Sequence, residues 1–269
     1  MKYLIAVDLE GAHGIVGEPY KGLITQLPDY KKAVENVTKE VNAAIKALYD
    51  SGATGVYVWD NHGNLDNLDF SKIDTRAEKI KPISNGIGRL DFLKEYSIKA
   101  MLMIGYHSRE GTLNGVLAHT YSSNDIQYYK LNGKAIGEFD FDSVIAQEFG
   151  VPTIFLSSDD VCVKQFEETH PQAVTAVTKI GKGRNEAEFL PVEQVLTDIY
   201  DGVCKAVKKN IVTEKNRFPY TIEVRYTRME YAASVFQKLQ AGGLAVEYGE
   251  DAHILTATVS SVQELRMFL

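Results

Sequence analysis

The first sixty residues alternate between short continuous apolar runs and one long helical pattern. The runs at 2–8 and 55–59 have strand length, as expected for strands that are buried on both faces. Between them, residues 29–49 place Val, Ile and Leu at three- and four-residue steps, and Gly52 follows as a stop signal. This order predicts a βαβ unit with parallel strands and a right-handed crossover.

The same alternation continues to about residue 210. Strands are expected near 99–105, 153–157 and 173–179, and helices at 140–149 and 190–209. Asn132-Gly133 lies between two β-rich pieces within 115–138 and is a strong hairpin signal. The pattern therefore predicts an α/β fold, with a mostly parallel sheet and helices on both faces.

The pattern changes after about residue 215. Five predicted elements follow: the strand TIEVRY, a helix at 229–241, the strands LAVEYGE and HILTATV, and a last helix from 261. We expect an α/β domain over 1–212, with a hairpin extension near 115–138, and a small α+β C-terminal subdomain over 213–269. The alternative is that the last strands extend the main sheet.

Composition narrows the class of protein. The net charge of −7 argues against a nucleic-acid binder, which would usually be basic. No apolar run approaches the ~20 residues that cross a bilayer, and Asp8 and Glu10 interrupt the apolar start, which favours a first strand over a signal peptide. The two cysteines lie far apart, which favours reduced thiols and a cytoplasmic protein.

Two carboxylates close the first strand. Because strand side chains alternate between faces, Asp8 and Glu10 point to the same side, where like charges repel unless a positive group joins them. His62 and His107 each come just after another predicted strand. The carboxyl ends of parallel strands meet at one edge of a sheet, and ligands bind there in open α/β folds.

Two further candidates lie around the predicted hairpin: His119 in LAHTY and Glu138 in AIGE. Carboxylates and imidazoles suit Zn²⁺, with Mn²⁺ and Co²⁺ as alternatives. Five ligands exceed what one tetrahedral zinc needs, so a carboxylate bridging two ions ~3.5–4 Å apart is predicted, with Asp8 as the natural bridge. Taken singly, each residue is more often a helix cap, a turn former or a core histidine.

A family resemblance rests on five short motifs. VDLEG, DNHGN, IGYHS, LAHTY and IGE, in this order and spacing, resemble the D-aminopeptidase family of the DppA type, peptidase family M55. The likeness runs from residue 1 to about 210 and includes KIGKGRNEAEFLP at 179–191. The last fifty residues match more loosely.

The resemblance implies an activity, a cofactor and an assembly. It implies a dinuclear zinc aminopeptidase that removes the N-terminal residue of short peptides, D-residues among them. It also implies a homodecamer of two stacked pentamers whose active sites face an inner chamber. By motif, the metal ligands are Asp8, Glu10, His62, His107 and Glu138, and His119 matches the histidine with a catalytic role.

Two other functions stay open from the sequence. One is another dinuclear hydrolase such as a phosphoesterase, which would want basic groups for phosphate; only Arg109 lies near the ligand stretches. The other is a metal-bound oligomeric shell without turnover, against which the retention of His119 argues. Preference for D- or L-substrates depends on pocket walls outside the motifs.

Several other residues have ordinary structural interpretations or more than one possible role. His13 is favoured as a loop residue over a pocket residue, Asp159 and Asp160 as helix N-cap residues, and His170 and His253 as structural. Arg184 would contact a substrate carboxylate, a neighbouring subunit or a surface acid.

The sequence gives weaker evidence about subunit contacts than about the metal ligands. The fifteen tyrosines, with the pair Tyr128-Tyr129, favour subunit interfaces. The hairpin at Asn132-Gly133 is a candidate arm, because two strands alone have little core to cover them. A hairpin that packs on its own sheet is the alternative.

Overall fold

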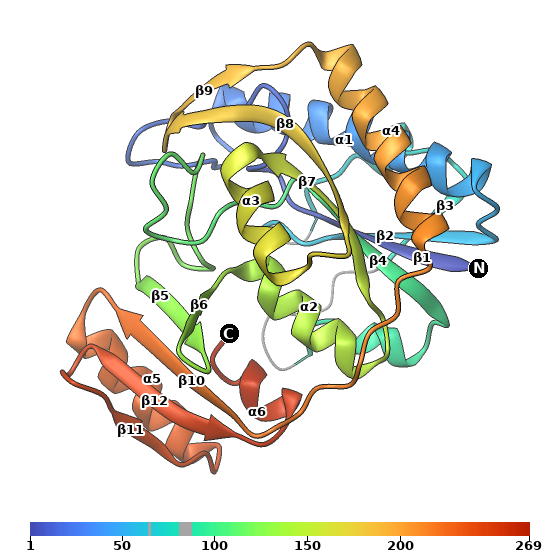
Figure 1. The fold of residues 1–269 in the computed structure, drawn as a ribbon. Coiled ribbons are helices and arrows are strands. Elements are labelled where there is room, and N and C mark those ends of the chain that lie inside the picture. Colours follow the sequence, from blue (N-terminus) through green and yellow to red (C-terminus); the bar gives the residue numbers. More distant parts are fainter. Residues whose placement is uncertain (64–65, 81–87) are drawn as a thin grey trace.

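The fold is built on two sheets. A computed structural model describes residues 1–63, 66–80 and 88–269. Figure 1 shows the larger sheet running through the middle of the molecule and the smaller sheet beside it, at the lower left. Asn64 of the DNHGN motif lies outside the described residues.

The larger sheet has seven strands in the order β3-β2-β1-β4-β7-β8-β9. Its strands are β1 Lys2–Val7, β2 Gly55–Asp60, β3 Ala77–Lys79, β4 Ile98–Ile104, β7 Thr153–Asp159, β8 Val174–Gly183 and β9 Glu186–Phe189. All neighbours are parallel except β8 and β9, which form an antiparallel hairpin. The inner strands are apolar on both faces because helices cover both, as in other parallel sheets.

Two helical layers cover this sheet. On one face lie α1 Pro28–Asp50 and α4 Val192–Lys209, whose buried residues pack with Ile5, Val7 and Leu102. On the other face lie α2 Glu138–Glu148 and α3 Asp160–Thr169, which pack with Leu4 and Met103. The predicted fold class, a mostly parallel sheet with helices on both faces, is confirmed. Short 3-10 turns at η1 Phe70–Lys72 and η2 Asp91–Lys94 follow β2 and precede β4.

The smaller sheet is antiparallel and has the order β11-β12-β10-β5-β6. Its strands are β5 Ile126–Leu131, β6 Lys134–Ile136, β10 Tyr220–Tyr226, β11 Val246–Tyr248 and β12 Ile254–Val259. The helices α5 Met229–Ala241 and α6 Val262–Arg266, together with Phe141 of α2, complete its core. The predicted α+β portion after residue 215 is therefore present.

The predicted hairpin exists, but its placement corrects the expectation. β5 and β6 flank Asn132-Gly133, and β5 pairs with β10 from Tyr226 to Ile222. Tyr129 and Ile136 are buried in the core of the smaller sheet. The expectation that the hairpin is an arm with little core of its own is therefore wrong. Its buried side chains join the core of the smaller sheet, and the edge of β10 pairs with the backbone groups of β5. The boundary at residue 212 stays a prediction, although the smaller sheet combines strands from both sides of it.

No helix within the described residues combines the length and the apolar character that crossing a bilayer requires.

Candidate metal centre

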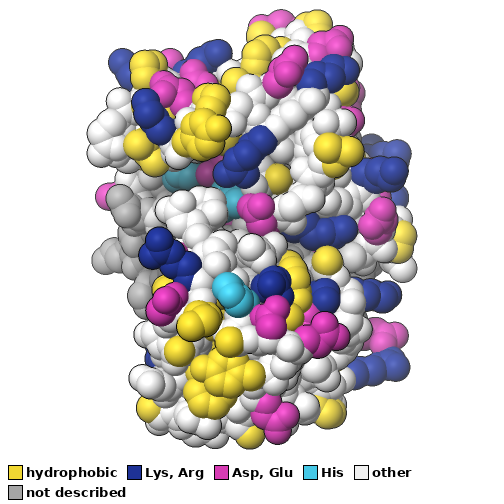
Figure 2. All heavy atoms as spheres, turned by 90° about the vertical axis from the view of Figure 1, so that its left-hand side faces the viewer, with side chains coloured by type: hydrophobic (Ala, Val, Ile, Leu, Met, Phe, Trp, Pro, Cys, Tyr) yellow, Lys and Arg dark blue, Asp and Glu magenta, His cyan; other side chains and the backbone are white. Residues whose placement is uncertain are grey.

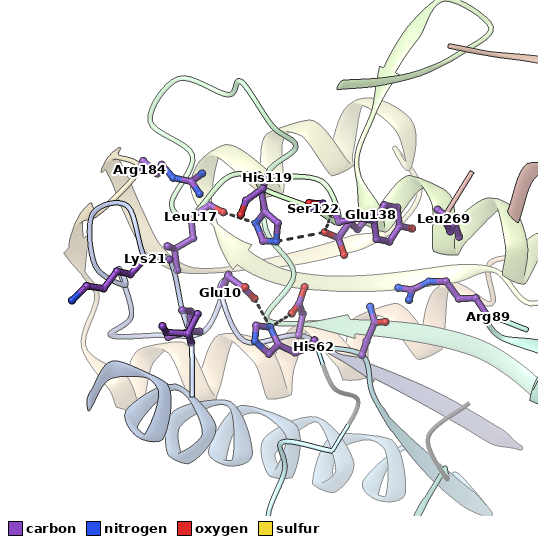
Figure 3. Close-up of a pocket in the computed structure, with 18 residues that line it drawn as sticks. Glu10, Lys21, His62, Arg89, Leu117, His119, Ser122, Glu138, Arg184 and Leu269 are labelled. Atoms are coloured by element: carbon purple, nitrogen blue, oxygen red, sulfur yellow. Dashed lines mark hydrogen bonds and ion pairs between the residues drawn. The ribbon is translucent and has the colours of Figure 1, made fainter. Parts of the chain in front are cut away.

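The candidate ligands follow neighbouring strands of the larger sheet. Asp8 comes directly after β1, His62 comes two residues after β2, and His107 comes three residues after β4. Because β2, β1 and β4 are adjacent and parallel, their carboxyl ends deliver these side chains to one place. Glu138 is the first residue of α2 and reaches the same place from the end of the β5-β6 hairpin. Figure 3 shows Glu10, His62, His119 and Glu138 converging there.

Two glycines allow the loops after β1 and β4 to touch. Gly11 donates its N–H to the carbonyl of Gly105, at 2.7 Å. A Cβ at Gly11 would lie 1.9 Å from the carbonyl oxygen of Tyr106, and Gly105 has a φ of +75°. Only glycine fits at either position. The two glycines therefore allow the loops that carry Asp8 and His107 to approach each other closely.

The first group of ligands centres on His62. Its Nδ1 lies 3.0 Å from Asp8 Oδ1 and 3.0 Å from Glu10 Oε2. Both carboxylates are buried, with 3% and 5% of Asp8 and Glu10 exposed. Each carboxylate thus places one oxygen beside the His62 nitrogen, and zinc prefers ligand atoms of these kinds.

The second group centres on His107. Its Nε2 lies 3.2 Å from Glu138 Oε1 and 3.4 Å from Asp8 Oδ2. This nitrogen is buried, and no residue in the described part of the chain makes a hydrogen bond to it. His107 Nδ1 lies 3.0 Å from the carbonyl of Ser108, which can only accept, so in the neutral imidazole Nδ1 carries the proton and the lone pair is on Nε2. An imidazole held in this tautomer is ready to bind a metal.

Asp8 belongs to both groups. Its Oδ1 faces His62 and its Oδ2 faces His107. A carboxylate with one oxygen directed to each of two sites has the arrangement of a bridging ligand.

His119 lies beside the second group. Its ring stacks on that of His107, with centroids 3.9 Å apart, and its Nε2 is 3.8 Å from Glu138 Oε1. His119 Nδ1 lies 2.8 Å from the carbonyl of Leu117, so this ring too presents Nε2 to the site. Glu138, His107 and His119 are close enough together to hold one ion. His119 is therefore an additional candidate ligand as well as a catalytic candidate.

Burial and mutual attraction shift the pKa values of the whole cluster. Burial, then the neighbouring Glu10, raises the pKa of Asp8 to about 7. Burial opposes ionisation of Glu138 as well, but the imidazole of His107 outweighs it, and the pKa of Glu138 falls to about 2. Burial likewise disfavours protonated His107, yet Glu138 raises the pKa of His107 to about 10. The carboxylates thus stabilise the protonated form of the imidazoles of His62 and His107.

A divalent cation fits this donor set. Buried like charges at Asp8, Glu10 and Glu138 require compensation, which protonated imidazoles supply here. Ligating histidines must be neutral, so metal binding would replace these protons with the charge of the ion. The unpartnered Nε2 of His107 between two carboxylate oxygens is the most direct sign of the fit.

A buried ion pair beside the cluster was missed by the sequence. Arg89 Nε and Nη2 donate to the two oxygens of Asp142 at 2.5 and 2.8 Å, and the guanidinium lies over Trp59. Asp142 also accepts from Tyr106 Oη at 2.7 Å and from Asn61 Nδ2 at 3.3 Å. The available signal was the presence of an acid at position 142 inside an apolar helix pattern, which demands a buried partner.

Lys179 was missed as well. It is fully buried in β8, and its Nζ donates to the carbonyls of Glu10, Ala12 and Ile15 at 2.6, 2.8 and 2.8 Å. Three acceptors on the loop after β1 are thus held by one ammonium. Lys179 therefore fixes the backbone that carries Glu10.

A cavity of about 450 Å³ opens at the cluster. It is lined by all the candidate ligands and His119, apart from His107, which is 2% exposed. Figure 2 shows histidine and acidic side chains in a recess of this face, with basic side chains beside them. Arg109 is not among the lining residues that the structure describes, whereas Lys21, Arg89 and Arg184 are.

The remaining residues of interest have local roles. Asp159 Oδ1 accepts from the N–H groups of Val161 and Cys162, which confirms the predicted helix N-cap. Asp160 accepts from Gly181 N–H at 2.7 Å. His13 Nε2 lies 2.7 Å from the carbonyl of Leu190, outside the cavity lining, in line with the favoured loop interpretation.

Comparisons with known proteins indicate the family and the fold. A family model described as peptidase M55, D-aminopeptidase, matches residues 1–248. A curated D-aminopeptidase of Bacillus subtilis (strain 168) is 27% identical over 190 residues, which are 71% of this chain and 68% of the relative. A solved structure, the Zn-dependent D-aminopeptidase DppA from Bacillus subtilis, described as a self-compartmentalizing protease, superposes with a TM-score of 0.87 at 21% identity. That match covers 99% of this chain and 94% of the other and shows a shared fold.

Proposed function

The chain belongs to the M55 family of D-aminopeptidases, and on this premise we propose that it is a zinc-dependent aminopeptidase acting on short peptides. Members of this family are peptide hydrolases, so the phosphoesterase and the non-catalytic shell that the sequence left open are not favoured. The Zn²⁺ assignment is supported by the Zn-dependent relative and by the donor set, with Mn²⁺ or Co²⁺ as substitutes.

We propose two metal sites that share Asp8. Glu10 and His62 complete one site, and His107 and Glu138 complete the other. The observation that carries this proposal is the buried Nε2 of His107, which faces Glu138 Oε1 and Asp8 Oδ2 without a hydrogen bond among the described residues. The two oxygens of Asp8, which face different histidines, support the bridging role.

Zinc bound at these sites would activate a water molecule at neutral pH and polarise the peptide carbonyl. His119 is then the catalytic group. Burial and then the neighbouring His107 lower the pKa of His119, which favours its neutral imidazole. Its Nδ1–H is held by the Leu117 carbonyl, and Nε2 is therefore the atom that takes up a proton and passes it to the leaving amine.

Assembly and location complete the proposal. The related protease is self-compartmentalizing, and we propose that this chain also assembles, as a homodecamer of two stacked pentamers. An enclosed site would admit only short, flexible peptides. Both cysteines are free thiols, which supports a cytoplasmic location.

The test is a release assay with metal analysis. Elemental analysis should find about two divalent ions per chain. Zinc-loaded protein should release the first residue from D- and L-dipeptides, chelated protein should not, and zinc should restore release. A folded sample that holds no metal, or that hydrolyses phosphate esters and no peptide, would overturn the proposal.

A further inference from the structure

The charged side chains that line the cavity are distributed unevenly. Apart from the three candidate ligands Asp8, Glu10 and Glu138, each charged side chain among the described lining residues is basic: Lys21, Arg89 and Arg184. Metal ions would neutralise the three carboxylates. The cavity then favours a ligand that carries negative charge on the part that points away from the metals.

Two of these three cations are already paired. Lys21 Nζ lies 3.0 Å from Glu18 Oε2, and Figure 3 shows its ammonium pointing away from the cluster. Arg89 is buried and donates through two nitrogens to Asp142. Both charges are therefore satisfied within the chain.

Arg184 differs from both. It lies in the turn between β8 and β9, and Figure 3 shows its guanidinium directed towards His119 and Leu117. Within the described residues no carboxylate pairs with it, and its side chain donates to the carbonyl of Ala118 alone. Four of its five N–H donors remain for a ligand.

The same turn holds the loop that carries His119. The carbonyl of Arg184 accepts the N–H of Leu117 at 2.8 Å, and its side chain holds Ala118, the residue directly before His119. The guanidinium is thereby held against the residue that precedes His119. Arg184 and His119 both line the cavity, so a substrate residue that follows the bond on which His119 acts would lie on the side of the cavity where Arg184 stands.

We propose that Arg184 binds a carboxylate on the leaving residue of the substrate, so that the preferred substrates are dipeptides with a free C-terminus. This inference rests on the proposed function, because it places the scissile bond beside His119. A planar guanidinium binds a carboxylate through two parallel hydrogen bonds and is suited to this role. A longer peptide would carry its C-terminal carboxylate past Arg184, and an amide would lack the charge.

The experiment compares one dipeptide in three forms: the free acid, the C-terminal amide, and an amide whose leaving residue is Glu. For the wild-type enzyme we expect kcat/KM to be about 10- to 100-fold higher for the acid than for the plain amide, as a charged hydrogen bond supplies. In Arg184→Met this ratio should fall to about one. The glutamyl amide distinguishes an α-carboxylate site from one that also accepts a side-chain carboxylate; either result supports carboxylate recognition if it requires Arg184.

Lys182→Met is the matched control. Lys182 lies in the same hairpin, pairs with Glu188 at 3.4 Å and does not line the cavity, so its loss should leave the acid-to-amide ratio unchanged. The ratio also removes any general effect of Arg184→Met on the His119 loop, because such an effect lowers both substrates equally. An Arg184→Met enzyme that keeps the wild-type ratio would overturn the inference.

A binding measurement makes the test independent of turnover. Calorimetry with a ketomethylene dipeptide analogue, as acid and as amide, should give about 10-fold or greater preference for the acid in the wild type and none in Arg184→Met. If no peptide is cleaved while this preference is present, the proposed activity fails and the carboxylate subsite stands. If peptides are cleaved and both forms bind equally, the subsite fails and the activity stands.

Discussion

Asp8 shows how much one residue depends on its neighbours. It is 3% exposed, and each of its two oxygens faces a different imidazole, His62 or His107. Burial and Glu10 raise its pKa to about 7, so without a cation this carboxylate is held at the edge of protonation. A carboxylate buried in this position is destabilising unless positively charged partners bind its two oxygens.

Removing Asp8 should remove both ions. Asp8→Ala takes one ligand from each proposed site, so we expect elemental analysis to find less than one tenth of the wild-type metal content. Asp198→Ala, an exposed acid on α4, should retain full content. Two ions retained in Asp8→Ala would eliminate the bridging role.

Replacing His119 separates a catalytic group from a ligand. His119→Ala should keep the fold and both metals while turnover falls by roughly 10²-fold or more, as expected for a lost proton-transfer group. Circular dichroism, metal analysis and the release assay follow the three properties. A loss of metal in parallel with turnover would make His119 a ligand beside Glu138, and near-normal turnover would make it structural.

At the scale of elements, β8 supports the loop that follows β1. Lys179 in β8 donates to three carbonyls of that loop, and Thr178 donates to the carbonyl of Gly11 at 2.6 Å. Burial lowers the pKa of Lys179 to about 8, with Asp159 and Glu40 opposing the shift, so the ammonium still predominates at pH 7. A strand three positions away from β1 in the sheet thus positions the candidate ligand Glu10.

Lys179→Met should therefore loosen this loop. Three buried acceptors lose their donor, and we expect the free energy of unfolding to fall by about 3 kcal/mol. Metal affinity should fall with it, since the backbone of Glu10 is no longer held. Denaturant unfolding and metal titration measure the two effects. Lys182→Met, exposed in the same strand, should change stability by less than about 0.5 kcal/mol, and equal behaviour of the two variants would refute the role of Lys179.

The end of α3 should make stability depend on pH. His170 stacks on Phe166 with ring centroids 4.3 Å apart, and burial lowers its pKa from 6.5 to about 4. Between these values the unfolded chain binds a proton that the folded chain does not. The stabilising contribution is therefore complete above pH 6.5 and is lost as the pH falls towards 4.

His170→Phe and His170→Gln should both reduce this dependence. Between pH 7.5 and 5, we expect the wild type to lose up to about 2 kcal/mol more unfolding free energy than either variant. Urea unfolding at the two pH values gives the comparison. Identical losses in all three proteins would show that His170 is protonated equally in the folded and unfolded chains.

For the whole molecule, the exposed apolar residues indicate where subunits would meet. Tyr20 and Leu113 are 108% and 84% exposed, and each lies in a segment that also contributes to the cavity wall or carries His119. In the β5-β6 hairpin, Ile126, Tyr129 and Ile136 are instead buried in the core of its own sheet. Loop tips beside the cavity are therefore better candidates for subunit contacts than the hairpin.

Light scattering tests this choice. The wild type should show a mass of several chains over a range of concentrations, and the double variant Tyr20→Asp/Leu113→Asp should shift towards one chain, because desolvating two new charges opposes association. Lys134→Glu, at the exposed hairpin, serves as the surface control and should leave the mass unchanged. A wild-type mass of one chain at all concentrations, in an active sample, would exclude an obligate assembly.

The sequence by itself determined several of the elements and the candidate ligands, whereas it did not predict β3, β9 or the extent of α3. Apolar runs and helical spacing located β1, α1, β2 and α5 within one or two residues, because local side-chain periodicity follows directly from backbone geometry. The same logic brought Asp8, His62 and His107 to one edge, since parallel neighbouring strands end together. Short motifs indicated the family, which the match over residues 1–248 bears out.

Only the tertiary structure decided which distant segments meet. The β5-β6 hairpin pairs with β10, about 90 residues later, and no local pattern encodes such a partner. The sequence did not show that Lys179 is buried or that Arg89 is the partner of Asp142, because burial and partners are properties of the folded chain. The placement of Arg184, which no carboxylate of the described residues pairs with, likewise arises only when the β8-β9 turn meets the loop that carries His119.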